Sequence, residues 1–213
     1  LLEQENRFDE AAQAYMEIVR VNPDNAAART GLGSVYSALK KYPEALNEYK
    51  EALRLDPKST HTYYHMGITY GQLGQNNEAI HHLTEAIRID TENSDAYYQL
   101  GITYFQIQRY QDAVDAFRRS IKIQPADSMS HFDLAKAYSE LSLYRESTDS
   151  LNESLRLNPK NYNAYYLLGK NNTKLGHYPK AIDALQKALE KNPIHGETWN
   201  ELGTAYMKMK QYQ

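Results

Sequence analysis

Apolar residues recur along the chain at spacings of three and four residues, which marks one face of an α-helix. Within residues 26–59 this pattern occurs twice, first around Leu32 and Tyr36 and again after a short break. The segment therefore predicts two helices, over 26–39 and 43–56, that are joined by a tight turn.

The whole pattern returns every 34 residues, so the chain is built of repeats. Three sets of positions follow this period: a proline set (Pro23, Pro57, Pro125, Pro159, Pro193, with Thr91 in the vacant place), a glycine set (Gly33, Gly67, Gly101, Gly169, Gly203, with Ala135) and an alanine set (Ala11, Ala45, Ala79, Ala113, Ala181, with Ser147). Carried along the chain, the period predicts twelve helices, at 9–22, 26–39, 43–56, 60–73, 77–90, 94–107, 111–124, 128–141, 145–158, 162–175, 179–192 and 196–209.

The start of the first helix in each pair carries its own signal. The residue two places after each proline position is Asn25, Ser59, Asn93, Asp127 or Asn161, and only His195 departs from this set. Asn, Asp and Ser side chains accept hydrogen bonds from the free amides of a helix's first turn. We therefore expect these residues to cap the first helices.

The repeat resembles a known family. Residues 96–101, Ala-Tyr-Tyr-Gln-Leu-Gly, followed by Tyr104, Tyr110, Ala113 and Pro125, are similar to the tetratricopeptide repeat. The resemblance covers the whole chain and implies an all-α fold, a right-handed α-α superhelix (solenoid) in which the first helices line a concave groove. The expected organisation is a single array over 1–213: a part repeat 1–25, full repeats 26–59, 60–93, 94–127, 128–161 and 162–195, and a part repeat 196–213.

The strongest local departure from this family is Asn171-Asn172. A small residue is expected at 171, and 172 stands in the column of Tyr36, Tyr70, Tyr104, Tyr138 and Tyr206. Two amides placed in a packed face need hydrogen-bond partners. The pair predicts either a flexible joint or a ligand contact.

Composition narrows the possible chemistry. The 213 residues include 19 Tyr and no Cys, so disulfides, Cys-ligated zinc and thiol catalysis are excluded. The net charge of -3 is spread along the chain, and without a basic stripe no nucleic-acid partner is expected. No apolar run approaches the ~20 residues of a membrane-spanning helix, so no membrane insertion is expected. We expect a soluble protein, with the cytoplasm favoured over the periplasm, and the start at Leu1 indicates a piece of a longer chain.

Candidate catalytic and metal sites are few. His61 and His65 lie four residues apart on one helix face, and Asp95 takes the place of His61 in the next repeat, so the three could hold a divalent metal. Alternatively, groove positions simply tolerate His and Asp. A glycine-rich phosphate loop, a nucleophile elbow and a His-Glu-x-x-His motif are all missing from the sequence. We expect neither enzymatic activity nor a cofactor.

The expected concave groove is lined by one aromatic side chain from each of four first helices. These four and their neighbours on the same face form the predicted groove: Tyr64, Tyr98, Phe132, Tyr166, His65, Gln99, Ile68, Ile102, Lys136 and Lys170. Aromatic rings give a large contact area and lose little rotamer freedom. The composition suits a peptide that is partly apolar and acidic at one end, unless the rings only wall the groove.

Three functions are left open by the sequence. The first is a non-catalytic protein-interaction scaffold that binds a protein or peptide segment in the groove. The second is a targeting or regulatory arm of a larger enzyme or of a secretion or assembly machine. The third is a self-assembling array that associates through residues 196–213, where Trp199, Leu202, Tyr206 and Met209 would form an exposed apolar face. The alternative for this face is that the parent chain continues beyond it and supplies the next helix.

Overall fold

The computed structural model describes residues 2–211, and within them the chain forms twelve α-helices and no strand. The helices are α1 (Leu2–Val21), α2 (Ala26–Ala38), α3 (Tyr42–Leu55), α4 (Thr60–Gln72), α5 (Asn76–Ile89), α6 (Ser94–Gln106), α7 (Tyr110–Ile123), α8 (Ser128–Glu140), α9 (Tyr144–Leu157), α10 (Tyr162–Lys174), α11 (Tyr178–Lys191) and α12 (Gly196–Gln211). The predicted number and order of helices are confirmed.

The predicted capping residues are confirmed as well. The side chain of Asn25 accepts a hydrogen bond from the backbone N–H of Ala28, and Asn161 accepts one from Ala164 in the same way. The second helices begin one residue earlier than predicted, and α1 begins at Leu2 rather than at residue 9. The prediction for α1 was wrong because it followed the repeat phase, whereas the Glu, Gln and Leu residues before position 9 favour helix by themselves.

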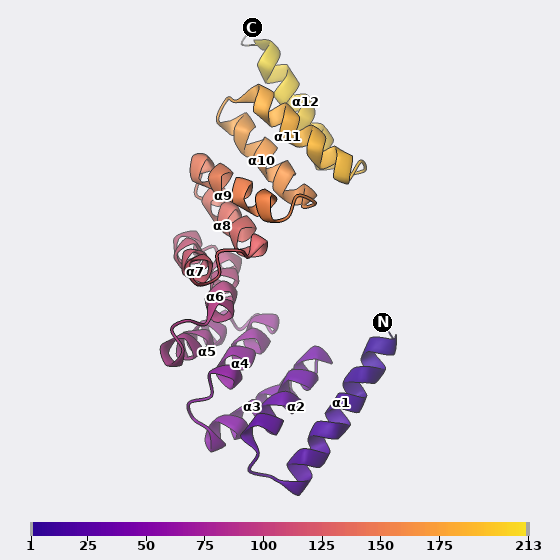
Figure 1. The fold of residues 1–213 in the computed structure, drawn as a ribbon, viewed down its shortest axis with the longest axis vertical. Helices are drawn as coiled ribbons and strands as arrows, with labels where there is room; N and C mark the ends of the chain where they lie inside the picture. Colours follow the sequence, from indigo (N-terminus) through magenta and orange to yellow (C-terminus); the bar gives the residue numbers. More distant parts are fainter. Residues whose placement is uncertain (1, 212–213) are drawn as a thin grey trace. The chain divides into compact units, whose positions relative to one another are not determined.

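The chain divides into two compact units, Leu1–Thr103 and Tyr104–Gln213, with the division inside α6. In the first unit, α2 packs on α3 and α4 packs on α5, while α3 lies against α4 and α2 touches α4 (Figure 1). In the second unit the same order returns, because α8 packs on α9, α9 on α10 and α10 on α11, and α10 touches both α8 and α12. Each unit is therefore a stack of helix pairs, in which every pair buries its apolar face on the next.

Close approach of the two helices in a pair explains the glycine positions. A Cβ built on Gly33 would lie 2.6 Å from the Tyr49 ring, and one on Gly169 would lie 2.4 Å from Leu185. The alanine positions facing these glycines, Ala45 and Ala181 among them, are fully buried. Helix pairing thus requires a small residue on both sides of the crossing.

Three of the departures from the repeat form one buried hydrogen-bonded network. The Asn171 amide donates to the Ser147 hydroxyl (2.7 Å), which in turn donates to the backbone carbonyl of Ala135 (2.6 Å). The Ser139 hydroxyl donates to the Asn171 side-chain carbonyl (2.9 Å). Asn171 is fully buried, so this amide links α8, α9 and α10 from inside the stack.

The apolar residues of α12 are only partly exposed. Trp199 (55%) and Tyr206 (44%) are exposed as expected, but Leu202 is buried because it packs against Leu185 and Leu189 of α11. The expectation that Leu202 is exposed was therefore wrong. Among the described residues no helix combines the length and apolar content needed to cross a membrane.

Candidate functional site

The residues of the predicted groove all lie on first helices and are shared between the two units. Tyr64, His65, Ile68, Tyr98, Gln99 and Ile102 belong to the first unit, and Phe132, Lys136, Tyr166 and Lys170 belong to the second. Nine of the ten are half-buried and Lys170 is exposed. Their side chains are therefore reachable by a partner without being loose on the surface.

On α4 the aromatic side chain Tyr64 contacts His65, which in turn contacts His61. The ring of Tyr64 lies 5.2 Å from that of His65 in an edge-to-face arrangement. The His65 ring also stands edge-on to His61 at 4.3 Å, with 3.1 Å between their Nε2 atoms, and is stacked 6.5 Å from Tyr49. These contacts fix the Tyr64 ring from one side.

The surroundings of Tyr64 and His65 keep these two side chains uncharged at neutral pH. Burial, with a smaller contribution from His61, lowers the pKa of His65 to about 4. Burial and then the negative charge of Asp95 raise the pKa of the Tyr64 hydroxyl. Tyr64 and His65 thus present a neutral phenol and a neutral imidazole on α4.

The metal hypothesis is left without a third ligand. His61 and His65 do face each other, but among the described residues no group of three or more His, Asp or Glu side chains is arranged to hold a metal ion. Asp95 instead acts on Tyr64 through its charge.

On α8 the predicted groove residue Lys136 is already engaged by its own neighbours. Its Nζ forms an ion pair with the buried carboxylate of Asp133 at 2.9 Å. The same ammonium group lies 4.9 Å from the ring centre of Phe105 and 5.7 Å from that of Phe132. Lys136 therefore contacts two aromatic rings. Because its charge is already paired with Asp133, we expect it to attract an acidic peptide less strongly than an unpaired lysine would.

Phe105 was missed by the sequence reasoning. The equivalent positions in the other repeats hold Ser37, Gly71, Ser139, Thr173 and Met207, so the repeat pattern gave no reason to place an aromatic ring there. Only its proximity to Lys136 and to Tyr110, whose ring centre is 5.3 Å away, shows that it belongs to this face.

On α10 the aromatic side chain meets acidic residues of α12. Tyr166 lies 5.2 Å from the His195 ring and packs on the leucines between α11 and α12. Burial raises the pKa of its hydroxyl, and so do the charge of Glu197, a hydrogen bond to it and the charge of Glu201. Glu197 and Glu201 occupy the repeat positions of His61 and His65, and they place negative charge beside the Tyr166 hydroxyl.

Comparison with known proteins identifies the repeat. The family model described as the cilia and flagella-associated protein 70 C-terminal domain matches residues 2–198, and a tetratricopeptide repeat model matches residues 184–213. The sequence matches no curated protein. The resemblance to the tetratricopeptide repeat is confirmed.

Solved structures share the fold. YrrB, described as a TPR protein with an unusual peptide-binding site, has a TM-score of 0.78 and 23% identity, and the match covers 89% of this chain and 98% of that one. MamA has a TM-score of 0.74 and 26% identity, with 81% and 94% covered. MamA from Desulfovibrio magneticus RS-1 has a TM-score of 0.74 and 20% identity, with 80% and 96% covered. The chain is an all-α repeat solenoid.

Proposed function

We propose that this chain, which belongs to the family of the cilia and flagella-associated protein 70 C-terminal domain, is a non-catalytic scaffold whose first-helix face binds a polypeptide segment. The fold is one that serves protein interaction, and YrrB is itself described as having a peptide-binding site. Binding by the present chain is inferred from its own side chains.

The observation that carries the proposal is the aromatic position of the first helices. Tyr64, Tyr98, Phe132 and Tyr166 stand at the same place in four successive repeats and all are half-buried. Three of the rings have described contacts: Tyr64 with His65, Phe132 with Lys136, and Tyr166 with His195, which precedes α12. Rings that are already held in place lose little freedom when a partner covers them, which favours binding.

The charges of the face specify the segment further. Lys136 is paired with Asp133, and Glu197 and Glu201 place negative charge near the Tyr166 hydroxyl. We therefore expect a partly apolar segment with aromatic or aliphatic side chains, and we expect acidic residues to contribute less than the two lysines alone would indicate.

Selection of peptides from an unbiased displayed library, followed by titration of the selected peptides, tests this proposal. Tyr98→Ala and Tyr166→Ala should weaken binding about tenfold or more, roughly 1.4 kcal/mol each. Phe8→Ala is a matched control, because Phe8 is an aromatic side chain on α1 with 40% exposure. Since Tyr166 also contacts the core, the melting temperature of each variant is measured as well. Unchanged affinity in well-folded variants would move the binding site to another face.

A second function, that of an arm within a larger assembly, is supported by the family description. That description refers to the C-terminal domain of a cilia and flagella-associated protein. Under this proposal, deletion of this segment from the natural protein would displace the remainder from its normal place in the cell. Unaltered location after the deletion would contradict an anchoring role.

A third function, self-assembly, is supported by exposed apolar side chains on the first and last helices. Trp199 and Met207 of α12 are 55% and 64% exposed, and Ile18 and Val21 of α1 are 43% and 76% exposed. Side chains of this kind are commonly covered by a partner. Under this proposal a second copy of the chain supplies the cover.

A further inference from the structure

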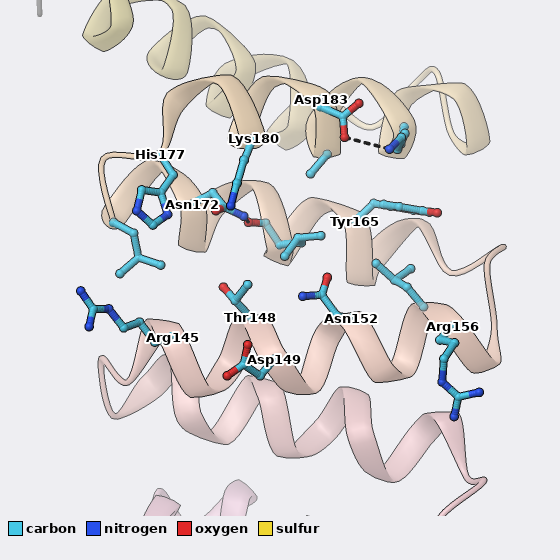
Figure 2. Close-up of a pocket in the computed structure, with 15 residues that line it drawn as sticks. Arg145, Thr148, Asp149, Asn152, Arg156, Tyr165, Asn172, His177, Lys180 and Asp183 are labelled. Carbon is cyan, nitrogen blue, oxygen red and sulfur yellow. Dashed lines mark hydrogen bonds and ion pairs between the residues drawn. The ribbon is translucent and has the colours of Figure 1, made fainter.

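A cavity of about 770 Å³ lies between α9, α10 and α11, and none of the predicted groove residues lines it. Figure 2 shows Thr148, Asp149 and Asn152 along α9 on one side and Asn172, Lys180 and Tyr165 on the other. Eight of the fifteen lining residues are exposed, so the cavity is a cleft that opens to the surface.

The cavity owes its size to residue 172. The first helices of other repeats have tyrosine at this position, whereas Asn172 is short, is 4% exposed and donates its amide to the Leu168 carbonyl at 2.8 Å. The cleft one repeat earlier, between α7, α8 and α9, is lined by Tyr138 and has a volume of about 480 Å³. An asparagine in place of tyrosine thus leaves room for an aromatic ring, against a wall that includes Leu155 and Leu168.

The charged residues that line the cavity also differ from those at the equivalent positions one repeat earlier. Four cations and two carboxylates line it. Arg156 and Lys187 are paired with Glu153 and Asp183, but Arg145 and Lys180 have no ion-pair partner among the described residues. The positions equivalent to Arg145 and Lys180 one repeat earlier are Gln111 and Glu146.

Figure 2 shows that Lys180 extends from α11 toward α9, and that Arg145 and His177 lie at the same end of the cleft. Near them the Thr148 hydroxyl is buried and has no hydrogen-bond partner in the described part of the protein. The equivalent residue one repeat earlier is the apolar Val114. Cations and a hydroxyl able to donate therefore gather beside the space that the tyrosine would fill.

We propose that this cleft, the Asn172 cavity, binds an aromatic side chain that is flanked by acidic residues in a partner polypeptide. The ring takes the place of the missing tyrosine against Leu168 and Leu155, and a neighbouring carboxylate pairs with Arg145 and Lys180. Charge-assisted hydrogen bonds of this type fix orientation as well as affinity. The site is separate from the predicted groove, so the chain has two binding faces.

Three capped tripeptides serve as probes in titrations followed by NMR of the ¹⁵N-labelled chain: acetyl-Asp-Phe-Asp-amide, acetyl-Asp-Ala-Asp-amide and acetyl-Lys-Phe-Lys-amide. The first should bind saturably, with the largest shifts at Asn172, Thr148 and Lys180. Loss of the ring or reversal of the charge should weaken binding about tenfold or more. Equal binding of all three peptides, or no saturable binding of the first, would overturn the proposal.

The decisive variant is Asn172→Tyr, which restores the residue of the other repeats and fills the cavity. It should keep or raise the melting temperature and abolish binding of acetyl-Asp-Phe-Asp-amide. Lys180→Glu should weaken binding, whereas Lys174→Glu, an exposed residue of α10 outside the cavity, should not. Tyr64→Ala should have no effect, which separates this site from the predicted groove. Full binding by a folded Asn172→Tyr protein would refute the assignment.

Discussion

At the scale of single residues, the atoms that surround a glycine show whether a larger residue could replace it. Gly33 and Gly203 hold the same repeat position, but a Cβ on Gly33 would lie 2.6 Å from Tyr49 and one on Gly203 would meet nothing within 4 Å. Helix propensity alone favours alanine over glycine by about 1 kcal/mol at both positions. Packing opposes the change only at Gly33.

We predict opposite effects for the two alanine substitutions. Gly33→Ala should lower the free energy of unfolding by roughly 1–3 kcal/mol, because the Tyr49 ring has to move. Gly203→Ala should raise it by up to about 1 kcal/mol. Urea unfolding followed by circular dichroism measures both, and equal effects would show that contact with the second helix does not set the glycine position.

Histidine 82 is a second residue whose surroundings differ from the repeat average. Its ring is stacked on Tyr70 at 5.2 Å and on Tyr63 at 5.9 Å, and its buried Nδ1 has no hydrogen-bond partner among the described residues. Burial is the main cause that lowers its pKa from 6.5 to about 4. Smaller contributions come from His81 and Lys50, which lower the pKa, and from Glu78 and Glu85, which raise it.

Stability should therefore fall as the pH drops from about 6.5 toward 4. In this range the unfolded chain takes up a proton at residue 82 that the folded chain does not, with an upper limit of about 1.4 kcal/mol per pH unit that solvent exposure reduces. His82→Phe, which keeps the ring stack, should flatten the dependence of melting temperature on pH. His81→Phe is the control: it removes only a smaller contribution to the pKa of His82, so most of the slope should remain. A slope unchanged in His82→Phe would assign it to other groups, His65 first.

At the scale of helices, the buried amide network shows what a repeat pattern can and cannot predict. The period, the caps and the glycine positions predicted which segments are helical and which faces pack, because every repeat carries its own copy of these signals. The link between Ser139 and Asn171 joins residues 32 positions apart, as does the one between Thr30 and Thr62. Each such contact depends on the side chain that stands in the neighbouring repeat, so Asn171 and Ser147 looked like separate departures in sequence although they are partners in space.

Their partnership predicts a coupled effect on stability. Asn171→Ala and Ser147→Ala should each lower the free energy of unfolding by roughly 1–3 kcal/mol. Ser147→Ala leaves the buried Asn171 amide without its acceptor, and Asn171→Ala takes away the acceptor of Ser139 and the donor to Ser147. The double variant removes both groups and should cost less than the sum, with a coupling energy of about 1 kcal/mol or more. Asn163→Ala, on the exposed side of α10, serves as the control. Simple additivity would show that the two side chains do not depend on each other.

The candidate site was predictable in position but not in charge. The aromatic position on the first helices follows from the repeat phase alone. Phe105 could not be placed on this face from its repeat position. Glu197 and Glu201 stand at the repeat positions of His61 and His65, but their effect on Tyr166 depends on which neighbouring side chains they reach. The Asn172 cavity was indicated only as an irregularity, since the volume left by a missing ring depends on the helices around it.

At the scale of the whole molecule, the exposed side chains of α1 and α12 have a common explanation. In the repeat phase α1 is a second helix and α12 is a first helix, so α1 of one copy is the type of helix that follows α12 of another. Gly203 leaves α12 open to close approach by such a helix. The apolar side chains available for this contact are Phe8, Met16, Ile18 and Val21 on α1 and Trp199, Tyr206 and Met207 on α12.

We predict that the chain associates head to tail as its concentration rises. Such a contact uses two different surfaces and does not close on itself, so sedimentation velocity should show a growing series of oligomers. Ile18→Glu and Trp199→Glu should each give monomers, because each removes one of the two surfaces. A mixture of the two variants still contains one intact α1 surface and one intact α12 surface, and should form a dimer and nothing larger. Oligomers that persist in Ile18→Glu would instead indicate pairing of α12 with α12, and a wild-type chain that stays monomeric would exclude both contacts.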